Sequence, residues 1–392
     1  MNRTVFYLPG FDPRGAKFYH RLYREQAERQ QLVNGLIINV GMRGRIDSAE
    51  HRWRIAARDA QGTTVNVDYR YLAWDDIVRK HWVKSPLRIL LALVRLVRVY
   101  VLSGVILRVA RLAKGPAITG LYPAVYLILA TLFLLVLGGF TGQHLAVVLG
   151  LAGSREFYFT LASIFFFCLL GYPLAVWVGE KLNVFWLLRI YQFSDRWVYQ
   201  GDSDLEARLD LFAAKIGEVL EDPDVDEVLV VGHSVGALLL APTVSRLIEA
   251  RRGCEKLRVL SLGHCVPVVS ELPQAGAYRR AVEQCGEVDT LHWYDFSAAR
   301  DGACFYGISP LYNYESEEKR GPVVCMTARF HTLFSDDSYQ RLKSDWYQLH
   351  FQYLMAAELP GLMDYYRFTA SPVPFLNQLE GQFDSRIKKV AA

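Results

Sequence analysis

The chain has 392 residues, of which 52% are hydrophobic, and its formal net charge is only +4. This length allows more than one structural unit, and so small a net charge gives no reason to expect a nucleic-acid partner. The charges are unevenly distributed, because residues 115–154 and 157–179 contain no Asp, Glu, Lys or Arg.

The N-terminal part of the chain alternates between strand-like and helix-like patterns. Its first apolar run is too short for a secretory signal peptide, and Pro9-Gly10 predicts a turn at the end of the first strand. Alternation at period two predicts strands, and apolar spacing predicts helices. The predicted strands are residues 4–10, 36–40, 51–57 and 64–69, with the second and third paired antiparallel, and the predicted helices are 15–31 and 74–82.

A basic and apolar stretch follows at residues 86–114. It contains no acid, and its basic residues are Arg88, Arg95, Arg98, Arg108, Arg111 and Lys114. At helical spacing the arginines lie opposite Leu, Val and Ile. This pattern predicts one or two amphipathic helices that lie in a membrane surface, with a solvated helix as the alternative.

Two long apolar runs come next, at residues 122–140 and 158–178. Apolar runs of about 18 residues or more are typical of membrane spans. Both therefore predict spanning helices, with buried core helices or a re-entrant hairpin as alternatives. Residues 182–191, which include Trp186 and Arg189, predict a second interfacial segment.

The C-terminal half again alternates strands and helices, which predicts a mostly parallel sheet with helices on both faces. The predicted strands are 227–231, 257–262, 290–296 and 323–328, and the predicted helices are 205–220, 237–250, 277–284 and 338–356. We therefore expect one α/β domain, formed by residues 1–82 and 195–392, that an all-α membrane insertion at 83–194 interrupts. Its candidate spans lie near 121–140 and 158–178.

The motif Gly232-His233-Ser234-Val235-Gly236 lies between a buried strand and a helix. In this setting G-x-S-x-G predicts a nucleophile elbow, because a sharp strand-to-helix turn exposes the serine hydroxyl and frees the next backbone N–H. Side chains at Gly232 or Gly236 would collide in so tight a turn. We therefore expect Ser234 to be a nucleophile.

A serine needs a general base, and the base needs an orienting acid. His331 follows the strand at 323–328 and is the expected base. The other histidines fit less well: His350 falls in a predicted helix, His292 in a strand, and His264 too early in the chain.

Two aspartates lie near the end of the strand at 290–296. Asp301, in a turn beyond that strand, is the expected acid, with Asp295 as the alternative. The N–H of Val235 is the first expected oxyanion donor. The N–H of Phe11 is the second, because Gly10 allows the backbone to approach closely.

These residues, together with the segment Leu8-Pro9-Gly10-Phe11, resemble the α/β-hydrolase superfamily of serine hydrolases. The resemblance covers roughly residues 1–82 and 195–392. It implies an α/β-hydrolase-type sheet and an acyl-enzyme on Ser234, with no cofactor and no metal. It departs from lipase-like relatives, since only about twenty-five residues, too few for a lid, join the strands at 257–262 and 290–296.

The expected function is a membrane-anchored, lipase-like serine esterase that cleaves an ester of a lipid or another apolar acyl compound. An acyltransferase with the same acyl-enzyme and a catalytically inactive membrane scaffold are the alternatives. Six cysteines without a C-x-x-C pair predict free thiols in a reducing compartment. The basic flanks of the spans place the hydrolase domain on the cytoplasmic face of the cytoplasmic (inner) membrane.

Overall fold

A nine-stranded, largely parallel sheet forms the centre of the protein in the computed structural model, which describes residues 1–251, 253–314 and 323–379. The strand order is β2-β4-β5-β1-β6-β7-β8-β9, and β3 pairs with β4. The strands are β1 (Asn2–Leu8), β2 (Ile37–Val40), β3 (Gly44–Arg45), β4 (Glu50–Arg58), β5 (Thr64–Leu72), β6 (Glu227–His233), β7 (Leu257–Leu262), β8 (His292–Ser297) and β9 (Val323–Thr327).

The sheet runs parallel from β5 to β9, and antiparallel pairs of β4 with β2, β3 and β5 form one edge. The expected antiparallel pairing of the second and third predicted strands is confirmed by β2 and β4. β1 and β6 are neighbours in the middle, with Leu8 opposite Gly232.

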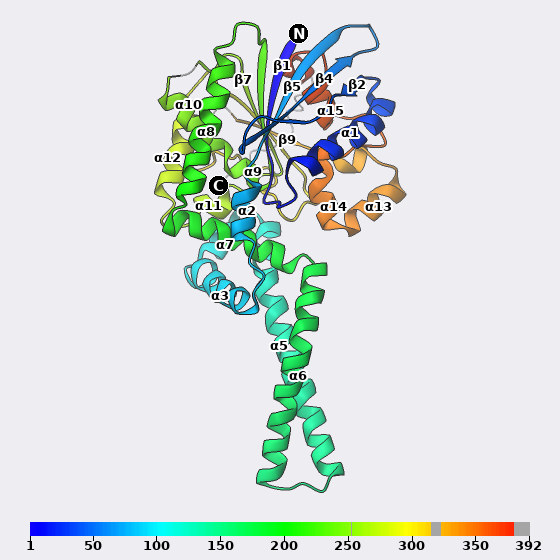
Figure 1. The fold of residues 1–392 in the computed structure, drawn as a ribbon, viewed down its shortest axis with the longest axis vertical. Coiled ribbons are helices and arrows are strands. Elements are labelled where there is room, and N and C mark those ends of the chain that lie inside the picture. Colours follow the sequence, from blue (N-terminus) through cyan, green and yellow to red (C-terminus); the bar gives the residue numbers. More distant parts are fainter. Residues whose placement is uncertain (252, 315–322, 380–392) are drawn as a thin grey trace.

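Helices cover both faces of the sheet, because its central strands are apolar on both sides (Figure 1). Along β6, Val228 and Val230 face one core, and Leu229 and Val231 face the other. α8 (Ser203–Leu220), α10 (Leu240–Glu249) and α12 (Gly276–Gly286) lie on one side. The other side holds α1 (Gly15–Asn34), α13 (Asp336–Ser344), α14 (Trp346–Phe351) and α15 (Tyr365–Ala370), and Phe375 and Leu379 of α16 (Phe375–Leu379) pack into the same core.

Short elements connect these layers. They are α2 (Asp75–His81), α9 (Val235–Leu238), α11 (Pro267–Ser270), η2 (Phe330–Thr332) and η3 (Gln352–Leu354). The predicted single helix at 338–356 is therefore divided into α13, α14 and η3, with Asp345 capping α14 through a bond from the Gln348 N–H.

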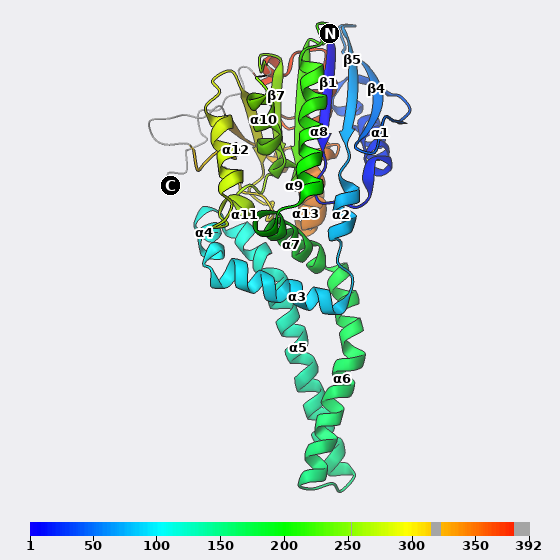
Figure 2. The same ribbon diagram turned by 60° about the vertical axis from the view of Figure 1, so that its left-hand side comes forward.

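A long helical hairpin projects from the base of the sheet domain (Figures 1 and 2). Its helices are α5 (Lys114–Val148) and α6 (Ser154–Lys181), and both are long and apolar enough to cross a membrane. At about 1.5 Å per residue, the charge-free residues 157–179 of α6 extend roughly 34 Å, which matches a hydrocarbon core of about 30 Å. Only 17% of the most apolar window of α5 and none of that of α6 is buried, so apolar side chains face outward along the hairpin.

Small residues bring the two hairpin helices into close contact. A Cβ on Gly138 would lie 2.7 Å from Ile164 Cα, and one on Gly142 would lie 2.8 Å from Thr160 Cα. The Ser163 hydroxyl donates to the Gly138 carbonyl at 2.8 Å. Glycines four residues apart are typical of close packing between membrane helices.

A bent helical segment runs across the base of the sheet domain where the hairpin begins (Figure 2). It consists of α3 (Pro86–Leu96), the π-helical η1 (Val97–Leu102) and α4 (Val105–Leu112), with a bend of 66°. α3 buries Ile89 and Ala92 and exposes Leu87, Leu90 and Leu91. α3 therefore has apolar side chains both on its buried face and on its exposed face.

The last helix of the insertion, α7 (Val184–Gln200), differs from the expected interfacial segment at 182–191. Most of its residues are buried between the sheet domain and the helices below it. Two of its charged side chains are paired internally: Arg189 pairs with Glu180 at 2.6 Å, and Asp195 pairs with Arg95. The elements from α3 to α7 occupy residues 86–200. Residues 252, 315–322 and 380–392 of the predicted domain segment 195–392 lie outside the described residues.

Candidate active site

Ser234 occupies a sharp turn between the end of β6 and the start of α9. Its backbone has φ 56° and ψ −121°. A positive φ of this kind is strained for a residue other than glycine. Both motif glycines are required by close approaches. A Cβ on Gly232 would lie 2.8 Å from Ala237 Cα, and one on Gly236 would lie 2.1 Å from the Leu8 carbonyl oxygen.

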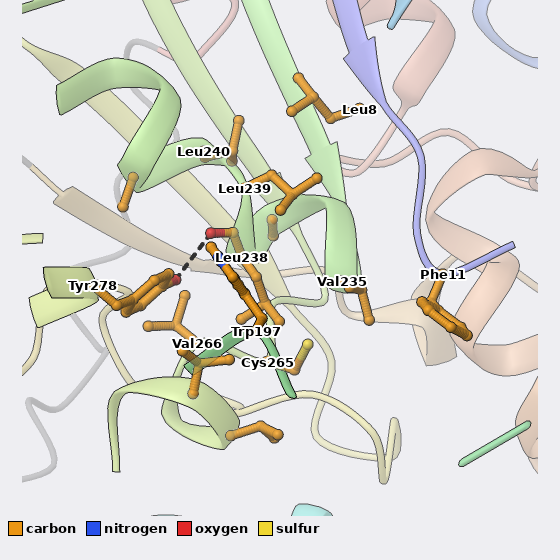
Figure 3. Packing of buried hydrophobic residues seen from close by; sticks show 14 of the residues in the cluster. Leu8, Phe11, Trp197, Val235, Leu238, Leu239, Leu240, Cys265, Val266 and Tyr278 are labelled. Atoms are coloured by element: carbon orange, nitrogen blue, oxygen red, sulfur yellow. Dashed lines mark hydrogen bonds between the residues drawn. The ribbon is translucent and has the colours of Figure 1, made fainter. Parts of the chain in front are cut away.

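Buried leucines hold the helix that follows the turn (Figure 3). Val235 and Leu238–Leu240 are completely buried, and the Tyr278 hydroxyl donates to the Leu238 carbonyl at 3.1 Å. The strained turn is therefore fixed by packing on its helical side. Val235 is the first residue of α9, so its N–H has no carbonyl one turn earlier in that helix.

The loop after β1 lies directly beside the serine. A Cβ on Gly10 would lie 3.3 Å from Ser234 Cβ and 3.7 Å from Ser234 Oγ, so glycine permits this approach. The carbonyl of Phe11 accepts a hydrogen bond from Trp186 Nε1 at 3.1 Å, which fixes the orientation of the loop. The expected donors of Val235 and Phe11 thus come from two segments that meet at Ser234.

The acid Asp301 pairs with His350, and not with His331 as the sequence predicts. His350 Nδ1 lies 2.8 Å from Asp301 Oδ2 and 3.0 Å from Oδ1, and both side chains are buried. His331 lies on the exposed side of η2, with its ring 6.2 Å from that of Tyr339. The structure therefore brings His350 to Asp301 and leaves the expected His331 apart from it.

The physical reason for this correction lies in the chain after β9. The backbone takes a left-handed turn at Arg329, with φ 41°, and carries His331 to the surface. It then returns through α13, and α14 buries His350 next to Leu349. An apolar Leu349 and Phe351 on either side of a histidine could have signalled a buried imidazole, but the sequence pattern favoured an ordinary amphipathic helix.

The two aspartates near β8 have different environments. Asp301 lies in the loop beyond β8, where it also accepts hydrogen bonds from the Ala303 N–H at 3.0 Å and the Tyr353 hydroxyl at 3.1 Å. Burial alone would raise the pKa of Asp301, but the neighbouring His350 and these hydrogen bonds lower it below its usual value. Asp295 lies within β8 and accepts from the Ser261 hydroxyl at 2.6 Å.

Ser234 and His350 line one cavity of about 220 Å³. Much of its wall is aromatic, and α6 and α7 of the insertion contribute to it. The lining residues are Gly10, Phe11, Asp12, Pro13, Arg14, Trp82, Glu180, Asn183, Trp186, His233, Ser234, Tyr347, His350 and Phe351. Such a volume is below the roughly 300–1,000 Å³ of sites that enclose a drug-sized ligand, so a long molecule would extend out of it.

The hydrogen bonds of His350 favour one tautomer of its neutral ring. When Nδ1 carries the proton and donates to Asp301, Nε2 is left as the acceptor of a neutral ring. Nε2 is buried and has no hydrogen-bond partner within the described part of the chain. An imidazole in this state, in the same cavity as a serine hydroxyl, can act as a general base.

His233, the residue before the serine, helps to hold α14 in place. Its Nε2–H donates to the His350 carbonyl at 2.9 Å, and the two rings lie 5.1 Å apart. Burial, followed by the proximity of His350, lowers the pKa of His233 to about 3. His233 is therefore a neutral donor, a role that the sequence motif alone does not reveal.

The first two turns of α5 contact the loop that carries Asp301. Thr119 Oγ1 donates to the Gly302 carbonyl at 3.0 Å, and a Cβ on Gly115 would lie 3.1 Å from Gly302 Cα. The insertion thus supports the acid loop as well as part of the cavity wall.

The location of the site follows from the topology of the sheet. From β1 the chain first builds the β5 side of the sheet, and it then returns at β6 to build the other side. β1 and β6 therefore flank the switch point where strand order reverses, and open α/β sheets bind ligands at the carboxyl ends of such strands. Gly10 and Ser234 follow these two strands.

Comparisons with known protein families, with curated proteins and with solved structures found no match to this chain. Among residues 1–251, 253–314 and 323–379, no cluster of three or more His, Cys, Asp or Glu side chains could hold a metal ion.

Proposed function

We propose that this protein is a membrane-anchored serine hydrolase of the α/β-hydrolase type, with Ser234, His350 and Asp301 as its catalytic triad. The observation that carries the proposal is the single cavity that contains a strained Ser234 and the free Nε2 of a histidine paired with Asp301. Serine, acid and histidine also occur in the chain order typical of this superfamily.

In this proposal the Ser234 hydroxyl attacks the carbonyl carbon of an ester, and His350 Nε2 takes its proton. Asp301 stabilises the imidazolium, and the N–H groups of Val235 and Phe11 bind the oxyanion. The imidazolium then protonates the departing alkoxide, which leaves as an alcohol. Water, activated by His350, attacks the acyl-enzyme and releases the acid and free Ser234.

The position of the cavity supports a lipid ester as substrate. Glu180 and Asn183 line the cavity at the end of α6 and the start of α7, directly after the apolar span. A cavity too small for a whole lipid, with one wall at the base of the hairpin, suits a substrate whose remaining chain stays in the bilayer. Basic residues before α5 and the sparse charge at the hairpin tip support a cytoplasmic sheet domain.

A fluorophosphonate probe tests the nucleophile. The probe's phosphorus forms a bond to the activated serine oxygen, and fluoride leaves. We expect the full chain in detergent to be labelled, and the Ser234→Ala variant, with an unchanged gel-filtration profile, to remain unlabelled. Equal labelling of both proteins would assign the reaction to another residue, and no labelling of folded wild-type protein would favour the inactive scaffold.

Hydrolysis and acyl transfer share this acyl-enzyme and differ in the acceptor. Turnover of a lipid ester in ¹⁸O-labelled water separates them, because only hydrolysis places the label in the released acid. We expect labelled acid, whereas acyl transfer to an added alcohol without labelled acid would favour a transferase.

A further inference from the structure

A second cavity, of about 810 Å³, lies where α2, α3 and α7 meet. Five of its lining side chains are basic and none is acidic; they are Lys80, Lys84, Arg88, Arg95 and Arg196. So many like charges around one hollow repel one another unless an anion lies between them.

Only two of these five charges are neutralised within the described residues. Arg95 pairs with Asp195, and Lys80 pairs with Asp204. Lys84, Arg88 and Arg196 form no ion pair in that part of the protein. Burial, followed by the charge of Arg95, lowers the pKa of Arg196; the nearby Asp195 opposes this shift, and Arg88 adds to it.

Neutral hydrogen-bond donors accompany the charges. Gln192 lines the cavity and is 6% exposed, yet its amide has no hydrogen-bond partner in the described chain. α3 begins beside the cavity, with Ser85 and Arg88 in the lining. Its first residue, Pro86, has no N–H, so the N–H groups of Leu87 and Arg88 are the ones without an intrahelical acceptor. A helix N-terminus, an arginine fork and a buried amide together are typical of a phosphate site.

The cavity also lies at the level expected for lipid headgroups. Leu91 of α3 lines it and is 58% exposed, and α3 runs across the base of the sheet domain beside the hairpin (Figure 2). Trp82 forms a wall of both this cavity and the one that contains Ser234. An occupant here would therefore have its polar part beside the candidate active site and its apolar part next to exposed leucines.

We propose that this cavity binds the phosphate group of an anionic membrane phospholipid. The phosphate oxygens accept from Arg88, Arg196 and Gln192, and the acyl chains extend past Leu91 into the bilayer. The proposal rests on the membrane placement described above and not on the reaction at Ser234. Fluorophosphonate labelling and lipid binding can therefore fail independently of each other.

Native mass spectrometry of the full chain in detergent tests the proposal with three probes: phosphatidylglycerol, phosphatidylcholine and inorganic phosphate. We expect tight binding of phosphatidylglycerol alone. The double variant Arg88→Gln/Arg196→Gln should lose affinity by about tenfold for each arginine, because each removes a charge-assisted bond. The matched control Arg98→Gln/Arg111→Gln removes two exposed charges from the same basic stretch outside the cavity and should change affinity less than about threefold.

A variant that leaves the net charge unchanged distinguishes binding at a specific site from general electrostatic attraction between the basic protein surface and the anionic lipid. Gln192→Leu keeps the net charge and a similar volume, and it should weaken phosphatidylglycerol binding several-fold with an unchanged gel-filtration profile. Equal losses in the cavity and control double variants would overturn the proposal. It would also fail if phosphatidylcholine or inorganic phosphate bound as tightly as phosphatidylglycerol.

Discussion

The imidazole of His350 depends on a set of buried partners rather than on its position along the chain. Asp301 accepts a hydrogen bond from Nδ1 of His350, and the His233 side chain donates to the backbone carbonyl of His350. The Tyr353 hydroxyl donates to the same Asp301 carboxylate. A carboxylate whose pKa is lowered stays ionised throughout the neutral range, so it can hold the same imidazole tautomer there.

The first prediction at this scale concerns separate substitutions of the two histidine candidates, His350 and His331. His350→Gln should lower kcat/KM for a lipid ester by about 10⁴-fold or more, because no other base replaces Nε2. His331→Gln, an exposed substitution, should leave kcat/KM within about twofold. Steady-state kinetics of the purified full chain distinguish them, and the opposite ranking would restore His331 as the base.

The acid is tested in the same way. Asp301→Asn should lower kcat/KM by about 10⁴-fold, because an amide favours the wrong imidazole tautomer. Asp295→Asn alters a side chain that bonds Ser261 within the sheet, and it should affect the melting temperature more than turnover. A larger kinetic loss for Asp295→Asn would reassign the acid.

His233 makes stability depend on pH. Its folded-state pKa is about 3 because of burial and the nearby His350, whereas an unfolded histidine titrates near about 6.5. The unfolded state therefore binds a proton first, so the stabilisation is complete above about pH 6.5 and is lost as the pH falls toward 3.

Melting temperatures of wild type and His233→Gln in detergent, measured between about pH 7 and pH 5, check this linkage. The wild type should lose stability by up to about 1.4 kcal/mol per pH unit more steeply than the variant. Parallel curves would show that His233 titrates alike in both states.

At the scale of elements, the hairpin depends on glycines of α5 that face α6. Gly138→Ala or Gly142→Ala would place a Cβ within 3 Å of α6 backbone atoms and force the helices apart. We expect a loss of about 1–3 kcal/mol, seen as a lower melting temperature in detergent. Gly139→Ala is the matched control, since its Cβ would lie 3.8 Å from the nearest side-chain atom. Equal effects at Gly138 and Gly139 would contradict this packing.

Local patterns predicted most of the elements, because periodicity reports which faces are buried. The elbow, the parallel strands and the two long apolar helices all follow from short segments of sequence. The partner of Asp301 does not, since His350 reaches it only through the path of the chain after β9. The burial of α7 was missed for a similar reason: Asp195 is neutralised by Arg95, 100 residues away in sequence, and Arg189 pairs with Glu180 of the preceding helix.

At the scale of the whole molecule, the hairpin separates two differently charged ends. Its tip carries only Arg155 and Glu156, while basic residues gather where it leaves the sheet domain. If both helices cross the bilayer, the tip and the sheet domain face opposite sides.

Cysteine labelling in intact cells tests this arrangement with a membrane-impermeant maleimide. Ser154→Cys at the exposed tip should react from outside, and Ser344→Cys on the sheet domain should react only after lysis. Protection of both cysteines would favour a re-entrant hairpin, and labelling of Ser344→Cys alone would invert the orientation.

The contact between the start of α5 and the Asp301 loop limits how this protein can be truncated. Excising residues 83–194 to obtain a water-soluble enzyme would remove Asn183 and Trp186 from the cavity wall and the Thr119 support from Gly302. We expect such a truncated chain to be inactive even where it folds. By the same reasoning, a protease that cut the sheet domain from the hairpin would end the proposed activity rather than liberate an active fragment.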